Sequence, residues 1–89
     1  MFSPRGHVAN EEAAISFTLG RPGPVTVRIY NRAGRLVREV ASGQPMNAGA
    51  NLVRWDGRDS DANLVQAGVY LVVVEALGKK EVKTLAVAR

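Results

Sequence analysis

The sequence predicts an all-β protein, a small antiparallel β-sandwich of about six or seven short strands. Three observations support this prediction. Apolar and polar residues alternate with a period of two in several short segments. Glycine, proline, asparagine and aspartate cluster between these segments, at intervals of about 8–12 residues. No long segment has the periodicity of an amphipathic helix.

Two strands are expected in the first third of the chain. From Glu11 to Leu19 the sequence alternates, with Ile15 and Phe17 on the face that also holds Leu19, which is the pattern of a half-buried strand. Two glycines and two prolines at positions 20–24 end this strand, because proline cannot donate to a β-ladder. Val25 to Tyr30 alternates in the same way and predicts a second strand.

A β-hairpin is predicted next. Asn31 to Gly34 has the composition of a turn, and Gly34 is free to adopt a positive φ. Leu36 to Val40 is too short for a helix and is flanked by glycines, so we expect it to be the returning strand. Ala41 to Ala50 contains two glycines and a proline and is expected to form an irregular connection.

Two further strands are expected in the second half of the chain. Asn51 to Trp55 predicts a strand with Trp55 on its core side, because Trp55 is in phase with Val53. Val69 to Ala76 is apolar on both faces, which is typical of a central strand that is covered on both sides.

The chain is expected to close with a hairpin. Leu77 to Lys80 predicts a tight turn, and Glu81 to Ala88 predicts a final strand with Leu85 and Val87 in phase. Together these elements indicate a small Ig-like or fibronectin-III-like sandwich.

Length and composition indicate one domain, residues 1–89, with a modest core. The chain has no cysteine, which excludes a disulfide and a thiolate metal site. Its longest apolar run, Val69 to Val74, is far shorter than the ~20 residues of a membrane-spanning helix. The first residues lack the apolar segment of a secretory signal, so we expect the chain to be a module of a longer secreted parent.

The net charge of +4 arises from nine arginines and three lysines against eight carboxylates. These cations are scattered along the chain, and only Lys79 and Lys80 are adjacent. Few aromatic residues are available to stack on bases. We therefore expect solvated, arginine-rich strand faces and no nucleic-acid partner.

Three aspartates in one loop, Asp56, Asp59 and Asp61, are candidate ligands for a calcium ion. An EF-hand loop that began at Asp56 would need a glutamate at its twelfth position, where the chain has Ala67. A looser site that uses two aspartates and backbone carbonyls is an alternative. The favoured interpretation is that these carboxylates bond to nearby backbone amides and stabilise turns, and no metal or other cofactor is predicted.

Catalytic residues are not evident. His7 is the only histidine, and no nucleophile or carboxylate is positioned beside it. Gly57 and Gly68 bracket the aspartate loop, but no phosphate-binding motif follows them, so we expect these glycines to serve turn geometry. The sequence thus gives no support for an enzyme.

Aromatic side chains are the residues that could form a sugar-binding platform. Trp55 and Tyr70 are large enough, but the phase of Trp55 predicts burial between the sheets. Tyr30 lies on the polar side of its strand and is the best candidate for an exposed aromatic. We expect it to be a cross-strand partner of a neighbouring side chain, with carbohydrate binding as an alternative.

Several pieces of the sequence, taken in order, resemble one family. They are Ile15–Leu19, Val25–Asn31, Ala33–Val37, Ala48–Gly49, Trp55–Gly57, Ala67–Tyr70 and Lys83–Arg89. Their order resembles the Ig-like domain first described in the flagellar hook-capping protein. It is also similar to the C-terminal sorting domains of proteins exported by the type IX secretion system, and Phe2–Pro4 resembles the end of their Pro-Asn-Pro-Phe opening.

The resemblance covers essentially the whole chain and implies a C-terminal module on a large secreted enzyme, such as a glycoside hydrolase or a protease. Such a module directs passage through the outer membrane, attachment to the cell surface, or both. The implied partners are the secretion or surface-anchoring machinery and the upstream domains of the parent. The residues implied in sorting and recognition are Gly68, Tyr70 and the terminal strand with Lys83, Leu85, Val87 and Arg89.

One departure from the family and one alternative function accompany this resemblance. Many members have glycine where this chain has Ala62-Asn63, so we expect Asn63 to supply the left-handed turn. The same scaffold also occurs as a passive structural or assembly module, including the hook-cap type, because a fold does not by itself fix a function.

Overall fold

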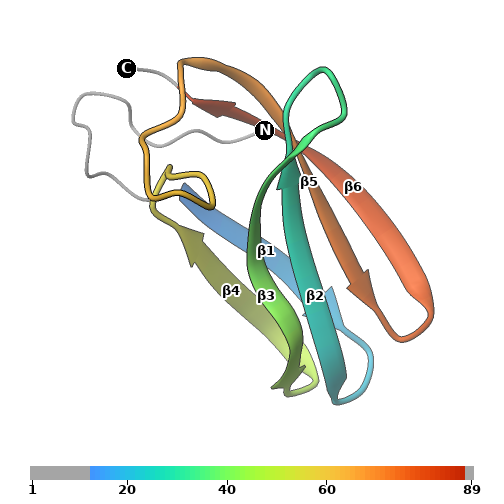
Figure 1. Ribbon diagram of the computed structural model, residues 1–89. Helices are drawn as coiled ribbons and strands as arrows, with labels where there is room; N and C mark the ends of the chain where they lie inside the picture. The colour runs from blue at the N-terminus through green and yellow to red at the C-terminus, as the bar shows by residue number, and fades with distance from the viewer. Residues whose placement is uncertain (1–12, 88–89) are drawn as a thin grey trace.

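The computed structural model describes residues 13–87, which form antiparallel strands in two layers (Figure 1). The predicted features at Phe2–Pro4, His7, Glu11 and Ala88–Arg89 lie outside these residues. The strands are β1 (Ala13–Leu19), β2 (Gly23–Tyr30), β3 (Leu36–Met46), β4 (Gly49–Trp55), β5 (Gly68–Ala76) and β6 (Lys79–Val87). Within the described part of the chain no helix is long and apolar enough to span a membrane.

The two layers are unequal in size. One sheet has the strand order β3-β2-β5-β6, and the other contains only β1 and β4. All pairings are antiparallel. In Figure 1 strand β1 passes behind β3 and β2, as in a sandwich, and β4 lies beside β1. This arrangement confirms the predicted antiparallel β-sandwich.

Strand β3 is longer than the sequence predicts. The expectation of an irregular connection over residues 41–50 is wrong, because β3 continues to Met46 and β4 begins at Gly49. The strand lies at a sheet edge and pairs with β2 through several register shifts. At an edge, Pro45 needs no ladder donor, and Gly43, with φ of 58°, donates its N–H to Thr26 Oγ1. Edge position therefore explains how a strand passes through turn-forming residues.

Strand β5 is central but covered on one face only. It pairs with β2 and β6, and its inward residues Tyr70, Val72 and Val74 are buried. On the outward face Leu71 is 37% exposed and Val69 is exposed as well. The expectation that both faces are covered is wrong, because the two-stranded sheet packs on one side and no third layer covers the other within residues 13–87.

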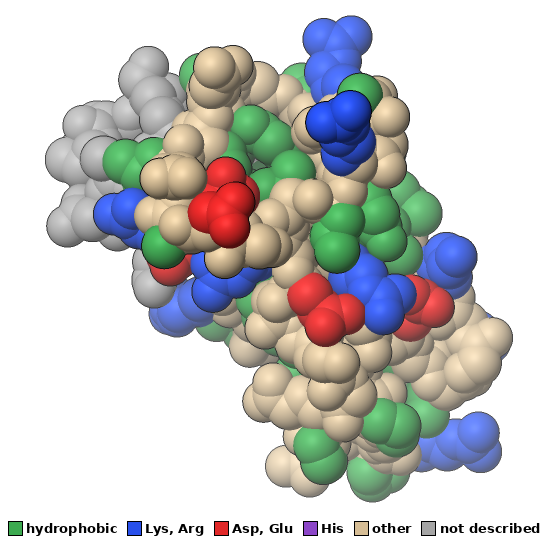
Figure 2. All heavy atoms as spheres, in the orientation of Figure 1, with side chains coloured by type: hydrophobic (Ala, Val, Ile, Leu, Met, Phe, Trp, Pro, Cys, Tyr) green, Lys and Arg blue, Asp and Glu red, His purple; other side chains and the backbone are tan. Residues whose placement is uncertain are grey.

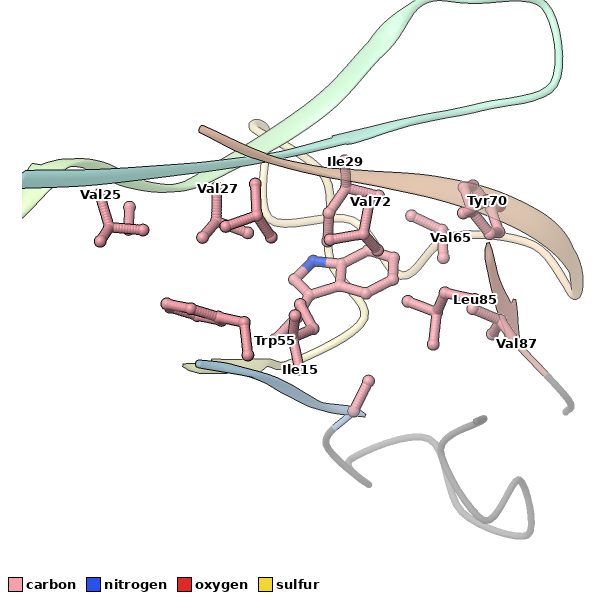
Figure 3. Packing of buried hydrophobic residues seen from close by; sticks show 14 of the residues in the cluster. Ile15, Val25, Val27, Ile29, Trp55, Val65, Tyr70, Val72, Leu85 and Val87 are labelled. Carbon is pink, nitrogen blue, oxygen red and sulfur yellow. The ribbon is translucent and has the colours of Figure 1, made fainter. Parts of the chain in front are cut away.

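The core is built around Trp55, which is 1% exposed, as the phase of β4 predicts. Figure 3 shows the indole between the two layers, among Ile15, Val72 and Leu85. The ring of Tyr70 contacts it edge-on, with centroids 5.9 Å apart and an interplanar angle of 66°. The burial of this residue confirms that the two sheets close on each other here.

The β5–β6 hairpin has a turn of two residues. Leu77 and Gly78 both have positive φ, 54° and 72°, as a type I′ turn requires. Lys79 and Lys80, which were predicted to belong to the turn, already pair with Ala76 and Glu75 as the start of β6. The side chain of Leu77 also packs against the core, which accounts for an apolar residue at this position.

The two faces of strand β6 differ in burial. Leu85 is 0% exposed and Val87 is also buried, whereas Val82, on the other face, is 55% exposed. This confirms the predicted phase of the strand.

We expect Leu85→Ala to lower the free energy of unfolding by about 2–4 kcal/mol, because it leaves a cavity beside the indole. Val82→Ala, a control on the opposite face of the same strand, should cost less than about 1 kcal/mol. Urea unfolding followed by tryptophan fluorescence measures both. Equal losses would contradict this account of the strand.

Candidate functional site

The residues implied in recognition meet at one end of the β5–β6 pair. The antiparallel register places Gly68 opposite Val87 and Tyr70 opposite Leu85. Lys83 follows on the same strand, opposite Val72. Two cross-strand pairs, separated by the Val69–Ala86 pair, thus bring together residues from two distant parts of the sequence. We call the set Gly68, Tyr70, Lys83, Leu85 and Val87 the terminal-strand site.

Most side chains of the terminal-strand site face inward. Tyr70, Leu85 and Val87 are buried in the core cluster. The phenol of Tyr70 donates a hydrogen bond of 2.7 Å to the carbonyl oxygen of Gln66, which satisfies its polar end. Of this set, Gly68 and Lys83 are accessible to solvent, and β6 has no second strand partner among residues 13–87.

Lys83 connects the two sheets. Its Nζ donates a hydrogen bond of 3.0 Å to the carbonyl oxygen of Ser16 in β1 and lies 3.1 Å from Glu81 Oε1. Its side chain is 38% exposed, so the ammonium group keeps contact with solvent. Sequence reasoning identified Lys83 by resemblance alone and did not predict this bond, since Ser16 lies 67 residues away.

The aspartate loop is organised by its own backbone. Asp59 Oδ1 accepts hydrogen bonds from the N–H groups of Asp61 and Asn63, at 2.9 and 3.0 Å. Asp56 Oδ1 accepts one from the N–H of Arg58, at 3.0 Å. These bonds confirm for Asp56 and Asp59 the interpretation that the carboxylates stabilise turns, whereas Asp61 contributes its backbone N–H.

Further bonds fasten this loop to the sandwich. The indole N–H of Trp55 donates to the carbonyl oxygen of Arg58 at 2.8 Å. Ser60 donates its N–H and its hydroxyl to the carbonyl of Val37 in β3. Arg38, also in β3, lies 3.6 Å from Asp56 Oδ1. Within residues 13–87, no three acidic or histidine side chains are grouped as metal ligands would be.

The left-handed residue of the loop is Ala62, with φ of 67°, and the expectation that Asn63 takes this conformation is wrong. Ala62 is held from both sides. Its N–H donates to the carbonyl of Asp59 at 3.0 Å, and its own carbonyl accepts from Arg58 Nη1 at 2.8 Å. The N–H of Asn63 is bound to Asp59, which fixes the turn one residue earlier. Gly57 also has a positive φ, 76°, as its turn role predicts.

The outer face of the larger sheet carries the partly exposed Tyr30. Its cross-strand neighbours are Leu36 and Leu71, which confirms the predicted cross-strand role. Figure 2 shows hydrophobic side chains gathered on this face beside acidic and basic ones. Trp55 and Tyr70 are buried, so neither adds to an exposed sugar platform in the folded domain.

One ion-pair chain on this face was not predicted. Arg28 donates to Glu39 at 2.7 Å and to Glu75 at 3.0 Å, and so links three strands. The hydrogen bond with Glu39 raises the pKa of the Arg28 guanidinium above its ordinary value. Glu39 and Glu75 belong to two other strands, and the alternation of apolar and polar residues does not specify which strands pair. The sequence therefore contains no signal for these ion pairs.

We expect Ala62→Gly to raise the free energy of unfolding by about 0.5–1 kcal/mol, because glycine adopts positive φ without a Cβ penalty. Ala33→Gly, in an exposed turn without positive φ, is the control and should leave stability unchanged or lower it by up to about 1 kcal/mol. Thermal unfolding by circular dichroism measures both changes. A loss of stability in Ala62→Gly would contradict the assignment of the left-handed residue.

We also expect millimolar calcium to leave the thermal midpoint unchanged, because the carboxylates of Asp56 and Asp59 already accept backbone N–H groups. Thermal unfolding in CaCl₂ and in EDTA provides the comparison. An upward shift with calcium that Asp59→Asn abolishes would show that the loop binds the ion.

Comparisons with known proteins identify the family of this domain and several similar structures. The family model described as the FlgD Ig-like domain matches residues 5–80. No curated protein matches the sequence. The structure is similar to FlgD from P. aeruginosa, with a TM-score of 0.67 and 26% identity over 86% of this chain and 61% of that chain.

Two proteins of Porphyromonas gingivalis are also similar. PorZ, described as an essential bacterial surface component of the type-IX secretion system, has a TM-score of 0.58 and 25% identity over 86% of this chain. PorU, described as dimeric and latent, has a TM-score of 0.57 and 22% identity over 93% of this chain, and this similarity concerns the fold alone. The chain spans only 12% of PorZ and 9% of PorU. Since the family model extends over most of the sequence, the chain belongs to the FlgD Ig-like domain family.

Proposed function

We propose that this domain is a non-catalytic C-terminal sorting and attachment module of a secreted bacterial enzyme, such as a glycoside hydrolase or a protease. The observation that carries the proposal is the similarity to a domain of PorZ, a surface component of the type-IX secretion system. On this proposal the protein acts outside the cell or on its surface, and its partners are the outer-membrane secretion or anchoring machinery and the parent's upstream domains.

The terminal strand has the physical properties that such a module needs. In the part of the chain that the structure describes, strand β6 pairs with β5 alone, so its outer edge offers backbone donors and acceptors to a partner. Leu85 and Val87 hold the end of this strand in the core. A receptor can therefore bind a fixed edge in the folded domain, and Lys83 adds a partly exposed charge beside that edge.

A second function, that of a passive structural or assembly module, is favoured by the similarity to FlgD. The scaffold would then position neighbouring domains without being recognised. The two functions differ in one respect: only the sorting module needs particular exposed residues near its terminal strand.

We expect residues 1–89, fused to a signal-bearing reporter, to bring the reporter to the surface of a type IX-competent host but not of a secretion-deficient mutant. Surface exposure is measured by antibody labelling of intact cells and by protease accessibility. In the double variant Lys83→Ala/Arg89→Ala, the fraction of the reporter at the cell surface should fall several-fold, because the proposed recognition surface loses two positive charges.

The matched control removes two positive charges elsewhere, in Lys80→Ala/Arg32→Ala, and should keep full display. The thermal midpoint of each purified variant is measured in parallel, so that a folding defect is separated from lost recognition. A reporter that stays in the periplasm in every case would overturn the sorting function and favour the passive module.

A further inference from the structure

Among residues 13–87, strand β1 pairs with β4 along one edge and with no strand along the other. It pairs with β4 over its whole length in a regular register, from Ala13–Trp55 to Leu19–Gly49. In such a pair, alternate residues direct both backbone groups toward the partner strand, and the residues between them direct theirs to the other side. Because Lys83 of β6 binds the Ser16 carbonyl, Ser16 belongs to the second set. The backbone groups of Ala14 and Thr18 share this orientation.

A groove of about 580 Å³ lies beside this edge, between β1 and the β5–β6 hairpin. Its apolar lining comes from both sheets and consists of Phe17, Leu19, Val74, Ala76 and Leu77. Its charged lining consists of Arg21, Lys79 and Glu81, so the charge at this end is net positive. The groove thus offers apolar surface at the Thr18 end of the row of backbone donors and acceptors.

We propose that the free edge of β1 is a strand-addition site for an extended peptide segment of another chain. We also propose that Lys83 hinders pairing at this edge, because its ammonium group occupies the Ser16 carbonyl. A peptide strand would pair with the N–H and C=O groups of Ala14, Ser16 and Thr18. Its alternate apolar side chains would enter the groove, and an acidic residue at one end would meet Arg21 and Lys79.

Lys83 sets the condition for binding. Its Nζ occupies the Ser16 carbonyl, which is the central acceptor of the edge. An incoming strand must displace this ammonium group, which can remain hydrated and close to Glu81. Inward-directed lysines are a known protection of sheet edges against unspecific pairing. The same residue therefore limits aggregation and leaves the edge available to a peptide that competes for one carbonyl.

This inference does not rest on the sorting function, since it is tested with purified protein. The probe is an acetylated and amidated peptide of alternating valine and threonine with an aspartate at each end. It is titrated into ¹⁵N-labelled domain, and amide shifts and hydrogen exchange are recorded. We expect shifts and slowed exchange at Ala14, Ser16 and Thr18, and a roughly three- to tenfold higher affinity in Lys83→Ala, which removes one competing hydrogen bond.

The control variant is Lys83→Ala/Thr18→Pro. Proline removes an N–H that faces the free edge and leaves the ladder with β4 intact, so binding should be lost while the Trp55 fluorescence of the folded core is kept. Shifts confined to β6, or none in either Lys83 form, would overturn the proposal. So would slowed exchange at Ser16 and Thr18 before peptide is added, or concentration-dependent self-association through the same amides, which would make a second copy the occupant.

Discussion

The hydrogen bond between the indole N–H of Trp55 and the carbonyl of Arg58 is the interaction on which the architecture depends. An indole can be buried only if its single donor finds an acceptor, and here the acceptor belongs to the loop that follows the same strand. The indole then fills the space between the sheets, against Tyr70 of β5 and near Leu85 of β6. Core packing and loop conformation are therefore one structural unit.

This coupling explains why so many hydrogen bonds fix the conformation of the aspartate loop. Asp56 and Asp59 bind backbone N–H groups, Ser60 binds β3, and Arg38 reaches across from β3 to the same loop. The carbonyl of Arg58 is thereby held where the indole needs it. The carboxylates of Asp56 and Asp59 therefore fix the conformation of the loop backbone.

The sequence predicts those features that depend on local periodicity. Alternation places Trp55 and Leu85 inside because a strand has only two faces, and the structure follows it. Alternation does not reveal how many layers a fold has. The sequence therefore predicts a covering layer over the apolar outer face of β5, and the described residues contain none. Nor does it reveal competition between hydrogen bonds: Asp59 moves the left-handed residue to Ala62, although asparagine adopts that conformation more readily.

Strand β6 combines two attachments of very different strength, and this difference bears on how a partner can engage the domain. Its terminal half is held by Leu85 and Val87, which are buried in the same core cluster as Trp55. Its middle is joined to β1 through one lysine that is already partly hydrated. A ligand that had to detach the end of β6 would work against the hydrophobic core, whereas a ligand that pairs with β1 displaces a single hydrogen bond. Displacement of the Lys83–Ser16 hydrogen bond therefore costs less than detachment of the end of β6, and it leaves the core closed.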